Sequence, residues 1–342
     1  MFIIMQPNAT SEQINQIIEH IKANGLDVRL SKKEKQISIQ LMGNEEKMHT
    51  LCLDNYPGIA QTFFTTSSYK LVSRAYHLED TIVEVNDLKI GDGTLSVMAG
   101  PCAVESLDQV RECARIAKKG GATILRGGAF KPRTSPYAFQ GLEEEGLSYL
   151  RQAADEYDLK VITEVMDEAH IEMVAHYSDI LQIGARNMQN FRLLQAVGKT
   201  QLPIGLKRGI AATIDEWLNA AEYIAAQGNQ NIIFIERGIR TFETATRNTL
   251  DLSAIPLLKQ ISHFPVIVDP SHGVGKWQLV SAMARAGIAA GSDGLIVEIH
   301  PDPSNAWSDG PQSLNEKNYL AMMNEVHIIE HAMQEIQKLN GE

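Results

Sequence analysis

The sequence predicts an α/β fold, a (β/α)8 TIM barrel with a small N-terminal ferredoxin-like (βαββαβ) domain. Eight short apolar runs, each followed by a segment of helical periodicity, extend from residue 95 toward the C-terminus. This alternation favours a barrel over an open doubly wound sheet, which stays the alternative. The chain of 342 residues is long enough for this large domain and for a small one before it.

The N-terminal domain, residues 1–66, begins with a predicted strand at Phe2–Met5. Thr10-Ser-Glu-Gln13 has the pattern of a capping box, and isoleucines then recur at helical spacing until Asn24-Gly25. Strands at about 27–31 and 36–42, a helix at about 44–54 and a strand at about 59–65 complete the ferredoxin-like order. No cluster of catalytic residue types falls in this domain, so a regulatory or assembly role is favoured over a purely structural cap.

Residues 67–94 are predicted to hold a linker and a hairpin that caps the barrel, with the hairpin around Gly91-Asp-Gly93. The barrel then occupies residues 95–342. Its eight predicted strands are the apolar runs Leu95–Ala99, Ala122–Leu125, Lys160–Val165, Asp179–Ile183, Pro203–Leu206, Ile232–Ile235, Pro265–Val268 and Gly294–Val297.

The bulk composition limits the classes of partner. With 44% hydrophobic and 21% charged residues, the chain has the composition of an ordinary soluble globular protein. Its net charge of −11 argues against nucleic acid and anionic membranes, because both bind broad basic surfaces. No apolar run is long enough for a membrane span, and the N-terminus lacks a secretory signal. Three scattered cysteines make no disulfide framework, so a cytoplasmic location is expected.

Basic residues gather at the ends of the predicted strands, where a barrel carries its chemistry. The loop Arg126-Gly-Gly-Ala-Phe-Lys-Pro-Arg-Thr-Ser-Pro136 alone brings three cations close together in an acidic chain. Six cations are expected to converge on one mouth: Arg126, Lys131, Arg133, Arg186, Lys207 and Arg237. Arginine grips phosphate or carboxylate through two parallel bonds and lysine adds a point charge, so the ligand should carry at least two anionic groups. Arg208 is the weakest candidate, because strand alternation turns it away from Lys207.

Cys102, His272 and Glu298 lie at the ends of strands one, seven and eight, which become neighbours when the barrel closes. Asp309 follows strand eight and can reach the same place, with Asp302 as its competitor. A thiolate, an imidazole and two carboxylates suit one divalent metal ion such as Zn, Mn, Fe or Co. Such an ion polarises a carbonyl as a Lewis acid. Taken singly, Cys102 would be a small core residue, and a lone histidine a satisfied buried one.

Six stretches resemble the 3-deoxy-D-arabino-heptulosonate 7-phosphate (DAHP) synthase family, in its single-barrel type with an N-terminal ferredoxin-like regulatory domain. They are Ala99-Gly-Pro-Cys102, Gly127-Gly-Ala-Phe-Lys-Pro-Arg-Thr-Ser135, Gln182-Ile-Gly-Ala-Arg-Asn-Met-Gln-Asn190, Gly205-Leu-Lys-Arg-Gly209, Glu236-Arg-Gly-Ile-Arg240 and Asp269-Pro-Ser-His-Gly273. The resemblance covers nearly the whole chain. It implies a metal-dependent condensation of phosphoenolpyruvate with erythrose 4-phosphate and water to DAHP and phosphate, the first step of the shikimate pathway.

Carried over by residue, the resemblance implies sites for two substrates and a metal. The phosphoenolpyruvate site comprises Arg126, Lys131, Arg186, Lys207, Arg237 and the Ala185 backbone N–H; the erythrose 4-phosphate site comprises Arg133, Thr134 and Ser135; the metal ligands are Cys102, His272, Glu298 and Asp309. Lys131 is the candidate proton donor to the new alkoxide, and Glu164 the candidate for handling the water. The family also implies a homotetramer, with tyrosine or phenylalanine as an allosteric inhibitor bound to the small domain.

Four other interpretations stay open. The cations could make separate salt bridges to helix carboxylates. A sister enzyme joins phosphoenolpyruvate to arabinose 5-phosphate, but its sugar loop resembles Lys-Ala-Asn-Arg-Ser-Ser and not Lys131-Pro-Arg-Thr-Ser135. A Schiff-base aldolase would use Lys207 or Lys131 as its nucleophile. A non-catalytic amino-acid sensor would bind tyrosine and release no phosphate.

Overall fold

The computed structural model describes residues 1–33, 36–53, 56–63, 68–131, 135 and 137–340. The chain divides into two compact units, Met1–Glu79 and Asp80–Glu342. The finer division at residues 66 and 94 stays a prediction.

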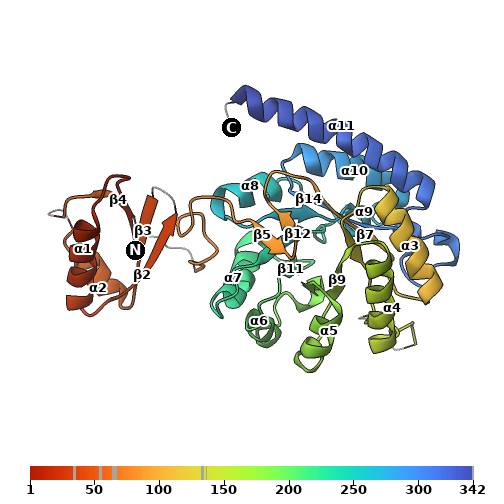
Figure 1. The fold of residues 1–342 in the computed structure, drawn as a ribbon, viewed down its shortest axis with the longest axis horizontal. Coiled ribbons are helices and arrows are strands. Elements are labelled where there is room, and N and C mark those ends of the chain that lie inside the picture. The colour runs from red at the N-terminus through yellow and green to blue at the C-terminus, as the bar shows by residue number, and fades with distance from the viewer. Residues whose placement is uncertain (34–35, 54–55, 64–67, 132–134, 136, 341–342) are drawn as a thin grey trace. The chain divides into compact units, whose positions relative to one another are not determined.

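The first unit contains a four-stranded antiparallel sheet in the order β2-β3-β1-β4 with two helices, which is the predicted ferredoxin-like arrangement (Figure 1). Its elements are β1 (Phe2–Met5), α1 (Ser11–Ala23), β2 (Asp27–Lys33), β3 (Gln36–Met42), α2 (Glu45–Thr50) and β4 (Ile59–Phe63). The predicted capping box is confirmed, because Thr10 and Gln13 each accept a hydrogen bond from the other's backbone N–H. The apolar face of α1 packs into a core with residues of β1 and β3.

The second unit is a closed barrel of eight parallel strands, in which β14 pairs with β7 (Figure 1). The strands are β7 (Ser96–Gly100), β8 (Ile124–Arg126), β9 (Lys160–Glu164), β10 (Ile180–Ile183), β11 (Ile204–Lys207), β12 (Ile232–Glu236), β13 (Val266–Val268) and β14 (Gly294–Glu298). All eight predicted strands are confirmed, and no end differs from its prediction by more than two residues. Closure sets Glu298 beside Gly100, so the end of the last strand meets the end of the first.

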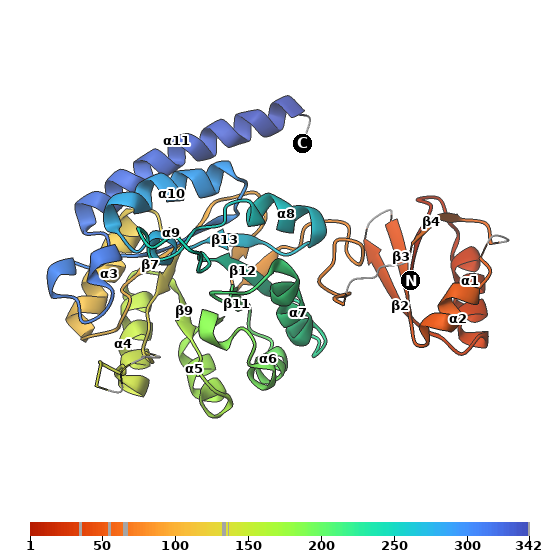
Figure 2. The same ribbon diagram turned by 180° about the vertical axis from the view of Figure 1, so that it is seen from behind.

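Helices surround the barrel in both views (Figure 2). They are α3 (Leu107–Lys119), α4 (Glu143–Glu156), α5 (Ile171–Tyr177), α6 (Phe191–Gly198), α7 (Ile214–Ala225), α8 (Ala254–Ile261), α9 (Pro270–Val274), α10 (Trp277–Ala289) and α11 (Glu316–Asn340). Single turns of 3-10 helix lie at Glu168–His170, Ala185–Asn187, Pro303–Asn305 and Gly310–Gln312. Among the described residues, no helix is both long and apolar enough to cross a membrane.

A hairpin precedes the barrel, but not where the sequence was expected to place it. Its strands are β5 (Val83–Val85) and β6 (Leu88–Ile90), so the prediction around Gly91-Asp-Gly93 was wrong in position. Asn86 makes the turn at a φ of 56°, a left-handed conformation that asparagine tolerates. The apolar side chains of the hairpin pack against inward-facing residues of the barrel strands. Asp87 also pairs with Lys160 at the start of β9, which places the hairpin at the N-terminal end of the barrel.

Candidate active site

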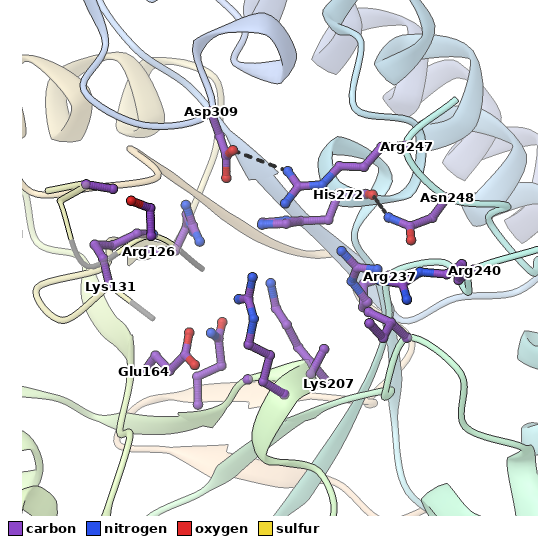
Figure 3. A pocket seen from close by; sticks show the side chains of 17 residues that line it. Arg126, Lys131, Glu164, Lys207, Arg237, Arg240, Arg247, Asn248, His272 and Asp309 are labelled. Carbon is purple, nitrogen blue, oxygen red and sulfur yellow. Dashed lines mark hydrogen bonds and ion pairs between the residues drawn. The ribbon is translucent and has the colours of Figure 1, made fainter. Parts of the chain in front are cut away.

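A cavity of about 460 Å³ opens at the C-terminal ends of the barrel strands (Figure 3). Its lining includes five of the six predicted cations, Arg126, Lys131, Arg186, Lys207 and Arg237. The sixth, Arg133, lies outside the described residues, as does Thr134. Ser135 and Ala185 line the same cavity. The structure therefore brings together every described residue that was predicted to bind phosphoenolpyruvate.

Three of these cations are held in place by buried groups. Nζ of Lys207 lies 2.7 Å from Oδ2 of Asp269, and Nη1 of Arg126 lies 2.9 Å from Oε1 of Glu298. Arg237 donates through Nη1 to the carbonyl of Gly238 at 3.1 Å. Burial lowers the pKa of Arg237, because the charged form is costly away from water. An anion in the cavity would compensate this cost.

The cavity also contains two arginines that were not among the predicted site residues. Arg240 and Arg247 come from the loop after β12 and point into the cavity with Asn248 (Figure 3). Arg240 ends a stretch that carried the family resemblance, which was a usable signal. Arg247 follows no strand directly, and its place depends on how the loop folds back on itself through the pairing of Ile239 with Thr249.

Glu164 ends β9 and lines the cavity among basic residues. Burial raises the pKa of its carboxyl, although Lys131 and Lys207 act in the opposite direction. The neighbouring strand end is Gly184, and a Cβ there would lie 2.0 Å from Oε1 of Glu164. A glycine is therefore required for the Glu164 side chain to take this position.

Three of the four predicted metal ligands come together beside the cations. Cys102, Glu298 and Asp309 each offer a donor atom, and the three atoms lie within 4.8 Å of one another. Burial and the charge of Glu298 raise the pKa of Cys102 to about 11. Burial also opposes ionisation of Asp309, but Arg247 and His272 outweigh it and hold its pKa at about 2. A thiol packed against two acidic groups fits a divalent cation, which would favour the thiolate.

His272 lies next to this group but is not one of the three. Its Nε2 is 3.4 Å from Oε1 of Glu298. Its Nδ1 is 2.8 Å from Oδ2 of Asp269. Asp269 therefore faces Nδ1, and Nε2 is the ring nitrogen on the side of the donor group. The four-ligand set with His272 stays a prediction.

Asp302, the alternative to Asp309 as a metal ligand, caps a turn instead. Its carboxylate accepts hydrogen bonds from Ser304 and Asn305 in the turn that it caps. Asp309, not Asp302, joins the donor group.

Lys131 connects the two halves of the site. Its ammonium donates to the backbone carbonyl of Cys102 at 2.8 Å and lies 3.1 Å from Sγ of the same residue. The lysine thus lies at the boundary between the cationic cavity and the metal-type donors.

Arg208 faces away from the cavity, as strand alternation predicts. It pairs with buried Glu236 at 3.0 Å and with Asp251 at 2.8 Å. Lys207 and Arg208 are adjacent in sequence, but only Lys207 lines the cavity.

Comparisons with known proteins agree with this geometry. The model of the DAHP synthetase I family matches residues 78–335, and that of the DAHP synthase ferredoxin-like domain matches residues 1–63. The phospho-2-dehydro-3-deoxyheptonate aldolase of Thermotoga maritima is 45% identical over 97% of this chain and 98% of its own length. Its crystal structure superimposes with a TM-score of 0.77 over 97% of both chains.

A more distant relative has the name of the sister enzyme. The 2-dehydro-3-deoxyphosphooctonate aldolase of Desulfosudis oleivorans is 32% identical over 69% of this chain and 91% of its own length. The higher identity and the fuller coverage both favour the heptonate aldolase. The barrel, the cationic cavity and the two matched family models lead to one assignment: the chain is an enzyme that belongs to the DAHP synthetase I family.

Proposed function

We propose that this enzyme condenses phosphoenolpyruvate with erythrose 4-phosphate and water to give DAHP and inorganic phosphate, the first step of the shikimate pathway. One observation carries the proposal: four buried or half-buried cations converge on a cavity, and a thiol and two carboxylates form a donor group next to it, joined to it by the contact of Lys131 with Cys102. The cations are suited to a multiply anionic substrate, and the mixed donors to a metal. The near full-length similarity to the Thermotoga maritima aldolase supports the choice of the four-carbon sugar.

Phosphoenolpyruvate would bind through Arg126, Lys131, Lys207 and Arg237, with Arg186 and the Ala185 N–H completing the site. Arg126 lines the cavity, and its Nε makes no hydrogen bond among the described residues, so this side chain has unused donor capacity. Erythrose 4-phosphate would bind through Arg133, Thr134 and Ser135. Holding both anions in one cavity brings their reacting carbons together.

One divalent metal ion would be held by Cys102, Glu298 and Asp309, with His272 as a fourth ligand. The donor set supports this, because the three closest donor atoms lie within 4.8 Å and combine a thiol with two carboxylates. When bound, the ion would polarise the aldehyde carbonyl of erythrose 4-phosphate as a Lewis acid. Metal analysis of the purified enzyme distinguishes among Mn, Fe, Zn and Co.

The residues of the chain would then move the protons. C3 of phosphoenolpyruvate attacks the aldehyde carbon, and Lys131 donates a proton to the new alkoxide. Its position 3.1 Å from Sγ of Cys102 supports this role. Positive charge develops at C2, and water adds there. Glu164, whose pKa burial raises, takes a proton from that water, and the resulting hemiketal phosphate then releases inorganic phosphate.

Phosphate release from the two substrates tests the proposal. We expect phosphate only when both are present, loss of activity after EDTA treatment, and recovery when a divalent metal is added back. Arabinose 5-phosphate replaces erythrose 4-phosphate in a parallel assay, and higher activity with it would assign the chain to the sister reaction. Activity that survives EDTA, together with borohydride trapping of a substrate adduct, would instead support a Schiff-base aldolase.

We also propose that tyrosine or phenylalanine binds the ferredoxin-like domain and inhibits the enzyme, and that the chain forms a homotetramer. The match of the N-terminal residues to a domain model of this enzyme family supports a regulatory role. Adding each amino acid to the phosphate-release assay tests inhibition, and light scattering of the intact protein tests the tetramer. Inhibition by neither amino acid would remove the regulatory proposal and leave the catalytic one intact.

A further inference from the structure

A buried glutamine lies behind the donor group and has no part in the function proposed above. Gln312 is 2% exposed and ends the short turn Gly310–Gln312. Its Nε2 donates to Oε2 of Glu298 at 2.5 Å, and its Oε1 accepts from Nη1 of Arg247 at 2.7 Å. A carboxylate can only accept and a guanidinium can only donate, so these two partners determine which way the amide points.

The first bond fixes the orientation of the Glu298 carboxylate. The last torsion of a glutamate side chain has a broad, soft energy profile, so one hydrogen bond leaves the carboxylate free to turn. In this structure each oxygen has its own donor: Arg126 binds Oε1 at 2.9 Å and Gln312 binds Oε2. Loss of either donor would allow the carboxylate to rotate about its last side-chain torsion.

The second bond places Arg247 against another candidate ligand. Nη1 of Arg247, held by Gln312, lies 3.3 Å from Oδ1 of Asp309 (Figure 3). The backbone N–H of Gln312 also donates to the carbonyl of Asp309 at 3.2 Å. Gln312 thus contacts Glu298 and Asp309 directly and controls the one arginine that pairs with the Asp309 carboxylate among the described residues.

These contacts are more than a buried amide needs for its own satisfaction. A buried amide must be hydrogen-bonded at both ends, and backbone groups usually serve this purpose. Asn229, for example, donates to the carbonyls of Thr200 and Leu202, before β11 and at the opposite end of the barrel. Gln312 uses both ends of its side chain on charged groups, one a candidate metal ligand and the other lining the substrate cavity.

We propose that Gln312 is a positioning residue for the metal, acting through Glu298 and through Arg247 on Asp309. The proposal rests on the metal site of the proposed function. Because it predicts metal affinity, it can be tested without measuring catalysis. Outer partners of metal ligands typically change affinity about 10- to 100-fold when they are removed, and we expect a loss of this size.

The test uses full-length protein stripped of metal and titrated with Co²⁺. Thiolate-to-cobalt absorption reports binding at Cys102, and competition with a chelating dye gives the affinity. Gln312→Met keeps the side-chain length but removes both hydrogen bonds, so its affinity should fall by about 10- to 100-fold. Gln312→Asn keeps the amide on a side chain one methylene shorter, so the amide can hydrogen-bond one partner at a time. Its cobalt affinity should lie between those of Gln312→Met and the wild type. This milder variant keeps the test decisive if Gln312→Met does not fold.

Asn229→Leu is the matched control, because it removes a buried amide far from the site. It should lose stability but keep the wild-type cobalt affinity. Equal affinity of wild type and both Gln312 variants would overturn the role of Gln312, and so would an equal loss in Asn229→Leu. Absence of a thiolate-cobalt band in the wild type would overturn the metal site itself. The two failures are therefore distinguishable.

Discussion

Replacing Arg208 with methionine should destabilise the barrel severely without removing a cavity residue. The guanidinium donates to Glu236 at 3.0 Å, to Asp251 at 2.8 Å and to the carbonyl of Ala212 at 3.0 Å. Its side chain is 5% exposed and that of Glu236 is fully buried. Methionine fills a similar volume, so the main loss is the positive charge between two carboxylates.

The expected magnitude follows from the carboxylate left behind. Removing one partner of a buried ion pair typically costs about 3–5 kcal/mol, because the remaining charge stays buried without compensation. An exposed pair provides the matched control: Arg111 and Glu156 have side chains 35% and 38% exposed, so water and salt screen their attraction. Arg111→Met should therefore cost far less than Arg208→Met.

Urea unfolding followed by tryptophan fluorescence measures the difference in the barrel alone. The three tryptophans, at positions 217, 277 and 307, all lie in the second unit. The loss of unfolding free energy in Arg208→Met should also grow as the pH rises. Burial already raises the pKa of Glu236, and loss of Arg208 raises it further. When the pKa of a carboxyl is higher in the folded protein than in the unfolded chain, the protein loses stability as the pH rises above the unfolded pKa, which is 4.5 for this group.

Two results would refute this reasoning. One is an unfolding free energy for Arg208→Met no lower than that of Arg111→Met. The other is a loss of unfolding free energy in Arg208→Met that becomes smaller as the pH rises from about 5 toward about 8, a range that lies above the unfolded pKa of 4.5. The KM for phosphoenolpyruvate should stay at the wild-type value in Arg208→Met, because Arg208 is not among the residues that line the cavity.

Three further predictions concern a proton donor, a surface cluster and a close contact. Lys131→Met should lower turnover by about 10²- to 10⁴-fold at saturating substrates, and near-normal turnover would remove Lys131 from the chemistry. Hydrogen bonds from Arg115 and Lys119 lower the pKa of Glu316 to about 2. The Tm of the wild type should therefore differ from that of Glu316→Gln at neutral pH, and the two values should converge as the pH falls from 4.5 toward 2. A difference that persists at the lowest pH would contradict that assignment. In Gly120→Ala, the new Cβ would lie 2.3 Å from Cε1 of buried Tyr319. Urea unfolding should therefore show a loss of stability of about 1–3 kcal/mol. An unchanged stability would mean that the Tyr319 ring moves aside without cost.

Much of the site could be predicted from strand periodicity. A barrel strand places its chemistry at its C-terminal end, so the apolar runs alone assign Glu164, Lys207 and Arg237 to the mouth of the barrel. The same alternation separated Lys207 from Arg208. Barrel closure also predicted that the ends of the first and last strands meet, and the pairing of Glu298 with Gly100 confirms it.

Loop positions were harder, because no periodicity applies to them. The hairpin turn was assigned to two glycines, but Asn86 makes it with a left-handed φ. Arg247 was not identified, since its position comes from a loop that folds back after β12. Nothing around Gln312 in the sequence distinguishes it from a surface glutamine.

The sequence by itself determined the fold class, the family and the chemical types at the strand ends. Each of these depends on local order along the chain, such as apolar periodicity, a capping box or a motif within a few residues. Only the tertiary structure decided which groups touch: Lys131 with Cys102, Arg208 with Glu236, and Gln312 with both Glu298 and Arg247. Gln312 and Arg247 are 65 positions apart, and no local pattern encodes such a contact. It arises when the barrel closes and brings loops from different strands to one end.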